Sequence, residues 1–234
     1  IALRQGFGDV LAEGARYASH RLGEATHDLA MEVKGQEIPM HEPRLKAGLG
    51  VGYAVSPTGA DHCHNLHDTI YAQEGTSLDA MRSLGMGGPL PANELSTAKA
   101  RMLVATTTWR YFANCAEFCQ FVPWTPTQMV EAISAVTGWN FSMLELANVS
   151  LRAMTLPRLF NLREGFTVKD DYLKPRFFEK LTEGPLAGVA LDRDAFDRTQ
   201  ADYYQIMGWD SEGRPLPGTL KALGLEWTLA EEGR

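Results

Sequence analysis

Hydrophobic residues recur at helical spacing along most of the chain, and strong end signals mark two of the helices. Thr125-Pro126-Thr127-Gln128 forms a capping box with proline at the first helical position, and Gly138 follows the expected end. Ser142-Met143-Leu144-Glu145 forms a second capping box, which opens a helix that Pro157 is expected to kink. Residues 95–111 present the broad apolar face of a third, long helix. These patterns predict a mainly α, multihelical fold.

Weaker signals predict three further helices near the two ends of the chain. Asp9 is expected to cap a helix that ends at Gly23. Asp194 is expected to cap another that closes at Gly208, and a last short helix follows Thr219. Aspartate suits the first position because its carboxylate accepts hydrogen bonds from the free N–H groups of the first turn.

The remaining segments lack a strong helical pattern. Residues 31–39 alternate apolar and polar side chains and end in proline, which indicates an extended connector or a short strand, but no convincing strand pair is evident. Residues 73–91 are rich in Gly, Met and Pro and are interpreted as a surface loop. Residues 47–54 are small and glycine-rich, which permits either tight helix packing or close approach of the backbone to a ligand.

Composition and charge exclude several classes of protein. With 234 residues the chain can bury a sizeable core, as one large domain or two smaller ones. A net charge of -7 argues against general nucleic-acid binding, which needs a basic face. No apolar run approaches the roughly 20 residues that span a bilayer. Three cysteines, two of them clustered, do not resemble a disulfide framework, which favours a cytoplasmic location.

Residues 61–68, Asp-His-Cys-His-Asn-Leu-His-Asp, form the most polar and chemically capable run in the chain. If this run is helical, His64 and Asp68 share a face, as do Cys63 and His67. Histidine, cysteine and aspartate at helical spacing suit a zinc ion, although no second ligand pair with zinc-finger spacing exists. The alternative is a histidine at a helix start, with its hydrogen bonds satisfied inside the protein.

The second candidate is Asn114-Cys115-Ala116-Glu117-Phe118-Cys119-Gln120-Phe121, which follows the long helix. It resembles a motif of the aldehyde:ferredoxin oxidoreductase family, the tungsten-pterin enzymes. In that motif an Asp, two variable residues, Gly, a hydrophobic residue and Cys precede a final aromatic. Asn114 stands where the family has Asp, and Glu117 where it has Gly. Further blocks resemble the family in the same order along the chain, at residues 6–14, 33–44, 52–62, 158–166 and 203–215.

The resemblance implies that the chain is the carboxyl-terminal helical region of a longer enzyme. In that family an amino-terminal sheet domain carries three clustered cysteines and a first pterin loop. In keeping with this, the sequence begins Ile1-Ala2-Leu3-Arg4, without a starting methionine or a signal-peptide layout. Residues 1–92 would be a helical segment of the middle domain, and residues 93–234 the carboxyl-terminal helical domain.

The resemblance also implies roles for particular residues. Cys119 would be the last ligand of a [4Fe-4S] cluster, whereas Cys115 would only pack. Asn114, Glu117 and Phe118 would contact a pterin of a tungsten (or molybdenum) bis-pterin cofactor. Asn114 still offers hydrogen bonds there, but Glu117 in place of glycine puts a left-handed turn in doubt. His62 would be a proton donor near the metal, since histidine titrates near physiological pH.

The implied activity is the oxidation of an aldehyde and water to a carboxylic acid, with two electrons passing through the pterin and the cluster to ferredoxin. The implied partners are ferredoxin, a small aldehyde or acid substrate, the amino-terminal domain and a second copy of the chain. One alternative is a reductive family member acting on an acid or an aromatic thioester. Another is a non-redox helical domain with structural zinc at His62–Asp68. For the redox enzyme, we expect glycines 48, 50 and 52 and both candidate segments to line one exposed, concave face.

Overall fold

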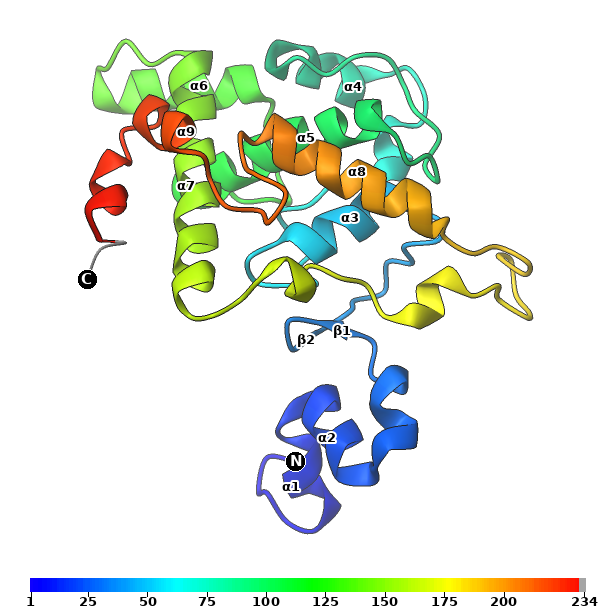
Figure 1. Ribbon diagram of the computed structural model, residues 1–234. Coiled ribbons are helices and arrows are strands. Elements are labelled where there is room, and N and C mark those ends of the chain that lie inside the picture. The colour runs from blue at the N-terminus through cyan, green and yellow to red at the C-terminus, as the bar shows by residue number, and fades with distance from the viewer. Residues whose placement is uncertain (232–234) are drawn as a thin grey trace.

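The computed structural model describes residues 1–231, which form a group of packed helices with one small hairpin (Figure 1). The mainly α prediction is therefore confirmed. The α-helices are α1 (Phe7–Leu11), α2 (Gly14–Leu22), α3 (Ala47–Val55), α4 (Thr76–Met81), α5 (Thr97–Cys115), α6 (Pro126–Thr137), α7 (Met143–Arg163), α8 (Arg193–Ile206) and α9 (Pro217–Ala222). The 3-10 helices are η1 (Glu24–Leu29), η2 (Asp68–Tyr71), η3 (Arg82–Leu84), η4 (Val168–Asp170), η5 (Pro175–Phe178) and η6 (Glu226–Glu231). The strands are β1 (Glu32–Val33) and β2 (Gln36–Glu37).

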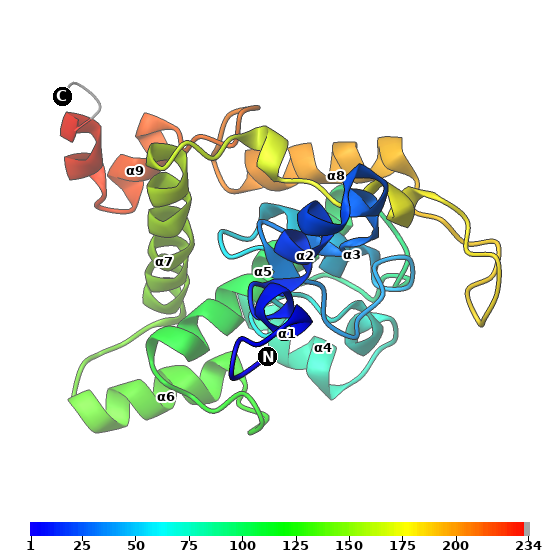
Figure 2. The ribbon, with the colours of Figure 1, turned by 90° about the horizontal axis from the view of Figure 1, so that it is seen from below.

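Helix α5 occupies the middle of the fold and packs against both α7 and α8 (Figures 1 and 2). It begins after Ser96, whose hydroxyl accepts a hydrogen bond from the backbone N–H of Lys99. The main hydrophobic core gathers around α3, α5 and α8 and includes Leu49, Val51, Leu103, Phe196 and Tyr203. Near its carboxyl end, α5 contributes Phe112 and Ala113 to a second hydrophobic cluster.

The two capping boxes open α6 and α7 as predicted. In each, the side chain of Thr125 or Ser142 accepts a hydrogen bond from the backbone N–H of the third helical residue. The side chain of that residue accepts a hydrogen bond from the backbone N–H of the cap residue. Gly138 takes the left-handed conformation after α6, with φ 73°. Helix α7 continues six residues beyond Pro157, to Arg163. Leucines of this helix, Leu151 and Leu159, pack against α9 and η6, which helps to offset the missing N–H bond at the proline.

The helix predictions near the chain ends need two corrections. The single helix expected after Asp9 is divided into α1 and α2, because Gly14 adopts a positive φ of 86°. Asp9 lies inside the first turn of α1 and forms an ion pair with Arg4 at 2.8 Å instead of capping. Helix α8 is capped by Asp192, while Asp194 lies in the first turn. A carboxylate is favourable at both places, so the sequence alone does not separate them.

The hairpin of β1 and β2 was not expected. Val33 pairs with Gln36 across a two-residue turn, in which Lys34 and Gly35 have φ values of 52° and 87°. Lysine is unusual at such a position. Its side chain is held by an ion pair with Asp171 at 2.7 Å, far along the chain. A tertiary contact therefore helps to select this turn.

Two segments assigned from local pattern also differ. Residues 73–91, interpreted as a loop, contain α4 and η3, because Leu78 and Met81 are buried and hold a short helix on the core. Residues 61–67 are irregular, with a turn at Cys63 and His64, and the 3-10 helix η2 begins only at Asp68. The shared helical faces considered for this run are therefore wrong.

The glycines of α3 serve tight packing and do not line an exposed face as expected. Every residue of this helix is buried. A Cβ atom at Gly52 would lie 1.9 Å from the side chain of Asn65. One at Gly48 would lie 2.6 Å from the carboxylate of Asp68. The segment that follows α3 folds back directly on these glycines, which leave room for it.

The main core includes residues from Val33 to Trp209, on both sides of the boundary expected after residue 92. The division into domains 1–92 and 93–234 stays a prediction. Helices α1, α2 and η1 lie together, apart from the other helices and beyond the hairpin in Figure 1. Among the described residues, no helix combines the length and the apolar character needed to cross a membrane.

Candidate functional site

The segment 114–121 begins as the last turn of α5 and leaves that helix through a left-handed residue, Glu117, with φ 59°. The N–H of Glu117 donates to the carbonyl of Asn114 at 3.3 Å, and that of Phe118 donates to Ala113 at 2.8 Å. These two bonds define a Schellman motif, whose left-handed position is usually glycine. Glu117 thus keeps the turn that its identity put in doubt, and the motif explains why glycine suits this place.

Phe118 follows the turn and packs into a second hydrophobic cluster. Its ring meets that of Trp124 with centroids 5.3 Å apart. The same cluster contains the buried side chains of Phe112, Ala113, Met129 and Leu146. A hydrophobic contact of this kind commonly accompanies a Schellman motif. The ring anchors the loop to α5 and α6, and its predicted contact with a pterin stays a prediction.

The polar and sulfur-bearing side chains of the loop face solvent. The thiol of Cys119 is exposed, and so is that of Cys115, which was expected to pack. The Cys115 thiol is nevertheless partly shielded from water, and this partial burial raises its pKa. Asn114 is exposed and accepts a hydrogen bond from the side chain of Gln120 at 2.8 Å. The loop therefore presents a thiol and an amide to whatever lies against it.

His62 belongs to a group of three histidines on the segments before and after α3. Its ring centroid lies 5.0 Å from that of His41 and 6.2 Å from that of His67. The ammonium of Lys46 lies 3.4 Å from Nδ1 of His41 and 3.1 Å from Nδ1 of His67. Lysine only donates, so His67 accepts at Nδ1 and donates from Nε2 to the carbonyl of His62 at 3.0 Å.

The neighbours of His62 are uncharged imidazoles at neutral pH. Burial, with a further contribution from Lys46, lowers the pKa of His67 to about 4. The same two causes lower the pKa of His41, and burial lowers the pKa of Lys46. Burial and the charge of Lys46 therefore keep the rings of His41 and His67 uncharged.

The other polar residues of the 61–68 run have internal roles. Asp68 is fully buried, forms an ion pair with Lys99 at 2.8 Å, and accepts the N–H groups of Gly48 and Leu49 at the start of α3. His64 is buried against the ring of Tyr111, with centroids 4.6 Å apart. The carboxylate of Asp68 is therefore engaged inside the fold and is not available as a ligand for the zinc ion considered at His62–Asp68.

A smaller donor group remains in this run. Metal-ligating atoms of Asp61, His62 and Cys63 lie within 4.8 Å of one another. Sγ of Cys63 is 3.9 Å from Nε2 of His62. These are consecutive residues on a turn, so their closeness follows from the sequence itself.

Helix α5 connects the two candidate segments. His64 packs on Tyr111 near the end of α5, and Cys63 interacts electrostatically with Arg110 of the same turn. The segment 114–121 follows directly. The structure therefore brings the 61–67 segment to the end of α5 that carries the cysteine loop, whereas the three glycines lie inside the core.

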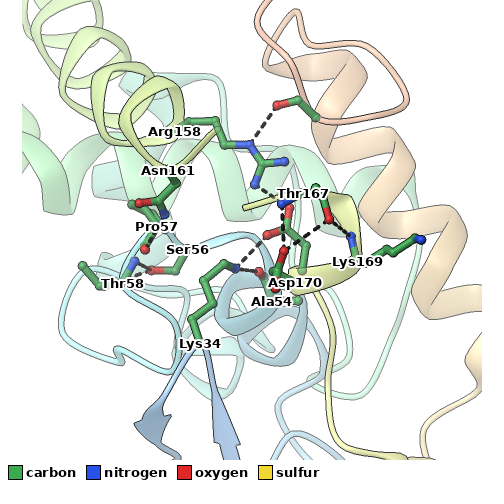
Figure 3. A network of polar contacts seen from close by, with 12 residues as sticks. Lys34, Ala54, Ser56, Pro57, Thr58, Arg158, Asn161, Thr167, Lys169 and Asp170 are labelled. Atoms are coloured by element: carbon green, nitrogen blue, oxygen red, sulfur yellow. Dashed lines mark hydrogen bonds and ion pairs between the residues drawn. The ribbon is translucent and has the colours of Figure 1, made fainter. Parts of the chain in front are cut away.

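Sequence reasoning missed a buried ionic network centred on Asp171. Its carboxylate pairs with Lys34 of the hairpin at 2.7 Å and with Arg158 of α7 at 2.6 Å, and it accepts the hydroxyl of Tyr204. Arg158 also donates to the carbonyl of Gly213 at 2.8 Å. Figure 3 shows Lys34 and Arg158 approaching this point from opposite sides.

This network joins segments that are far apart in the chain. Four of its members, Lys34, Arg158, Tyr204 and Gly213, lie in blocks that carry the family resemblance. Those blocks thus meet in a structural ion network. The spacing of single charges along the sequence offers no local pattern by which it could have been found.

A multihelical fold with an exposed cysteine loop and a histidine group at one end of its central helix fits a domain of a cofactor-dependent oxidoreductase. Comparison with known families agrees: residues 1–225 match the model described as aldehyde ferredoxin oxidoreductase, domains 2 & 3. The chain belongs to this family.

Relatives are similar over nearly the whole chain. A tungsten-containing aldehyde ferredoxin oxidoreductase of Pyrococcus horikoshii is 33% identical over 233 residues, covering 97% of this chain and 35% of the relative. An aliphatic sulfonate oxidoreductase, WOR-like subunit, of Pyrococcus furiosus is 29% identical, covering 96% and 33%. The chain thus spans 33–35% of the length of these two curated relatives.

A solved structure shares the fold. It is the active site complex BamBC of benzoyl coenzyme A reductase in complex with 1,5-dienoyl-CoA, with a TM-score of 0.65. The match covers 98% of this chain and 38% of that chain. At 18% identity, the likeness supports the multihelical architecture alone.

Proposed function

We propose that the protein to which this chain belongs oxidises an aldehyde and water to a carboxylic acid and passes two electrons to ferredoxin. Membership of the aldehyde ferredoxin oxidoreductase family supports this reaction class. The observation that carries the proposal is the Schellman loop, which presents the exposed thiol of Cys119 at the end of α5. The segment with His62 lies against the same end of that helix.

The side chains of the loop fit the cofactors of the family. A thiolate at Cys119 is the soft ligand that iron in a [4Fe-4S] cluster prefers, and its exposure leaves it accessible to a cluster. Asn114 offers an exposed amide for hydrogen bonds to a pterin. When bound, a tungsten or molybdenum bis-pterin would supply the oxygen-transfer chemistry and the cluster would carry the electrons. One thiolate cannot hold a cluster alone, so further cysteines of the whole protein are required.

His62 is the proposed proton carrier. Its main chain is held by His67, and the neutral ring of His41 lies beside it. A neutral neighbour does not repel a proton that arrives on His62, as a second cation would. An imidazole so placed can accept a proton during oxidation and release it to solvent, because His62 is partly exposed.

The test compares two cysteine variants of the whole protein, purified without oxygen. Cys119→Ser replaces a soft thiolate by a weakly coordinating hydroxyl of similar size, so the fold is retained while cluster binding is lost. We expect it to lose the cluster's visible absorption and at least tenfold of the ferredoxin-coupled turnover. Cys115→Ser, one helical turn earlier and also on an exposed residue, is the matched control and should keep both. Equal behaviour of the two variants, or loss only in Cys115→Ser, would contradict the assignment.

A further inference from the structure

A cleft of about 390 Å³ opens beside the cysteine loop, between α4, the end of α5 and residues 120–126. Helices α4 and α6 lie side by side at this end of the fold (Figure 1). Apolar and aromatic side chains of the walls include Ile70, Met81, Trp109, Pro123 and Trp124, and polar side chains such as Thr76 and Ser77 lie among them. Both the volume and the apolar lining are typical of a small-molecule site.

Arg110 and Tyr71 are polar side chains of the cleft that lack a hydrogen-bond partner among the described residues. Within that part of the chain, Arg110 is the charged residue of the lining, and its guanidinium lies over the ring of Trp109, 4.1 Å from the centroid. Within residues 1–231, the structure shows no hydrogen bond or ion pair for this guanidinium. The side chain of Tyr71 is 3% exposed, and its hydroxyl likewise lacks a hydrogen bond among the described residues. The Arg110 side chain is only partly buried, so both donors are open to an acceptor that enters the cleft.

We propose that this cleft binds a small monocarboxylate with an aromatic or branched apolar body, with Arg110 and Tyr71 as its anchors. A guanidinium matches a carboxylate through two parallel hydrogen bonds. A single cation without an acidic neighbour in the lining balances one negative charge, which favours a monocarboxylate over a multiply charged phosphate. The apolar walls then accept the rest of the ligand.

The electrostatics of the two anchors agree with this ligand. Burial lowers the pKa of Arg110, which measures the cost of holding its charge away from water, although arginine stays protonated at neutral pH. Burial raises the pKa of Tyr71 to about 12, so its hydroxyl remains a donor. An anion in the cleft would relieve the first cost and satisfy the second group.

The inference rests on the proposed function, because a carboxylate is the product of aldehyde oxidation. Gln120 and Phe121 line the cleft and directly follow Cys119, so the cleft adjoins the proposed cluster loop. Arg110 and Tyr71 would then act as specificity-determining residues that recognise the carboxylate of the product acid.

The experiment measures binding to the whole protein by calorimetry, without turnover. The probes are benzoate and its neutral isostere benzamide. Arg110→Gln should weaken benzoate binding at least tenfold and Tyr71→Phe about threefold, while benzamide binding stays within twofold. Arg101→Gln, on an exposed position of the same helix, is the matched control and should change neither. Arg110→Lys keeps the positive charge but cannot form the two parallel hydrogen bonds of a guanidinium. The affinity of this variant for benzoate should therefore lie between that of the wild type and that of Arg110→Gln.

Three results would overturn the inference. They are no benzoate binding at millimolar concentration, unchanged benzoate binding in Arg110→Gln, and equal weakening of benzamide. If Arg110→Gln does not fold, the benzoate affinity of Arg110→Lys is the deciding measurement. Wild-type affinity in that variant would contradict a contact through two parallel hydrogen bonds. Benzoate binding in a protein that oxidises no aldehyde would overturn only the proposed function. Aldehyde oxidation without benzoate binding would overturn only the assignment of this cleft.

Discussion

A single residue, Glu117, shows how the chain departs from a family pattern while keeping its geometry. The Schellman motif after α5 needs a left-handed residue, and Glu117 adopts φ 59°. For a residue with a Cβ atom this conformation costs roughly 1–2 kcal/mol. The packing of Phe118 against Trp124 helps to hold the turn in place. The strain is therefore tolerated because the surroundings determine the turn.

Glu117→Gly should stabilise the protein by about 1 kcal/mol, because glycine takes the left-handed conformation without the Cβ clash. The gain is smaller than the strain itself, since glycine also has more freedom in the unfolded chain. Urea unfolding of both proteins measures it. The matched control is Glu131→Gly, an exposed position inside α6, which should lose about 1 kcal/mol. A destabilised Glu117→Gly variant would show that the glutamate side chain contributes contacts that outweigh the strain.

At the scale of an element, α3 illustrates how packing overrides propensity. Alanine is about 1 kcal/mol more favourable than glycine inside a helix. Three glycines nevertheless occupy this nine-residue helix. At Gly48 and Gly52, side chains of the segment 65–68 approach the backbone too closely for a Cβ atom, and at Gly50 Pro43 and Leu173 lie close. Asp68 then receives the first N–H groups of the helix, and Lys99 balances its charge. The helix and the segment after it form one packed unit.

Gly52→Ala should destabilise the protein by about 1–3 kcal/mol, despite the better helix propensity of alanine. The new Cβ would lie 1.9 Å from Asn65, whose amide donates toward the backbone carbonyls of Leu49 and Asp61 and cannot move freely. Thermal unfolding provides the measurement. Gly87→Ala, where nothing lies within 4 Å of the added Cβ, should change stability by no more than about 0.5 kcal/mol. Equal effects at the two positions would mean that the contact with Asn65 relaxes without cost.

At the scale of the whole molecule, buried charges join distant segments. Asp171 ties the hairpin, α7 and α8 together through Lys34, Arg158 and Tyr204. Removing one member would leave a buried charge without its partner, which typically costs 3–5 kcal/mol. His41 and His67 have the opposite character, since they are partly buried without a counter-charge and burial lowers the pKa of each.

This difference predicts a loss of stability in acid. The pKa of His67 falls from 6.5 to about 4 on folding, so the unfolded chain binds more protons between these values. The contribution of neutral His67 to the free energy of unfolding is fully present above pH 6.5 and is lost as the pH falls toward about 4. At full strength it would be about 3 kcal/mol, and solvent screening at this partly exposed site reduces it to about 1–2 kcal/mol.

Replacing the histidine isolates the effect. His67→Gln should flatten the fall in unfolding free energy over this pH range, measured by urea titrations at several pH values. His20→Gln, on the exposed surface of α2, should leave the wild-type slope unchanged. A His67→Gln variant with an unaltered slope would place the acid sensitivity in the carboxylates.

Local sequence was sufficient for the features that depend on neighbouring residues. The capping boxes at Thr125 and Ser142, the end of α6 at Gly138 and the long α5 were all predicted, because caps and helical periodicity involve residues at most four apart. The family resemblance also came from the sequence, since its blocks occur together in order along the chain. The exposure of Cys119 and the turn at Glu117 were not readable in this way.

Tertiary structure alone decided the features that join distant residues. The turn at Lys34 depends on Asp171, 137 positions later, and the glycines of α3 depend on a segment that folds back over them. The cleft forms only where α4, α5 and residues 120–126 meet, and nothing near Arg110 in the sequence indicates that its charge would lack a partner. Such contacts are set by the burial of apolar surface over the whole molecule, which brings together polar groups that no local pattern connects.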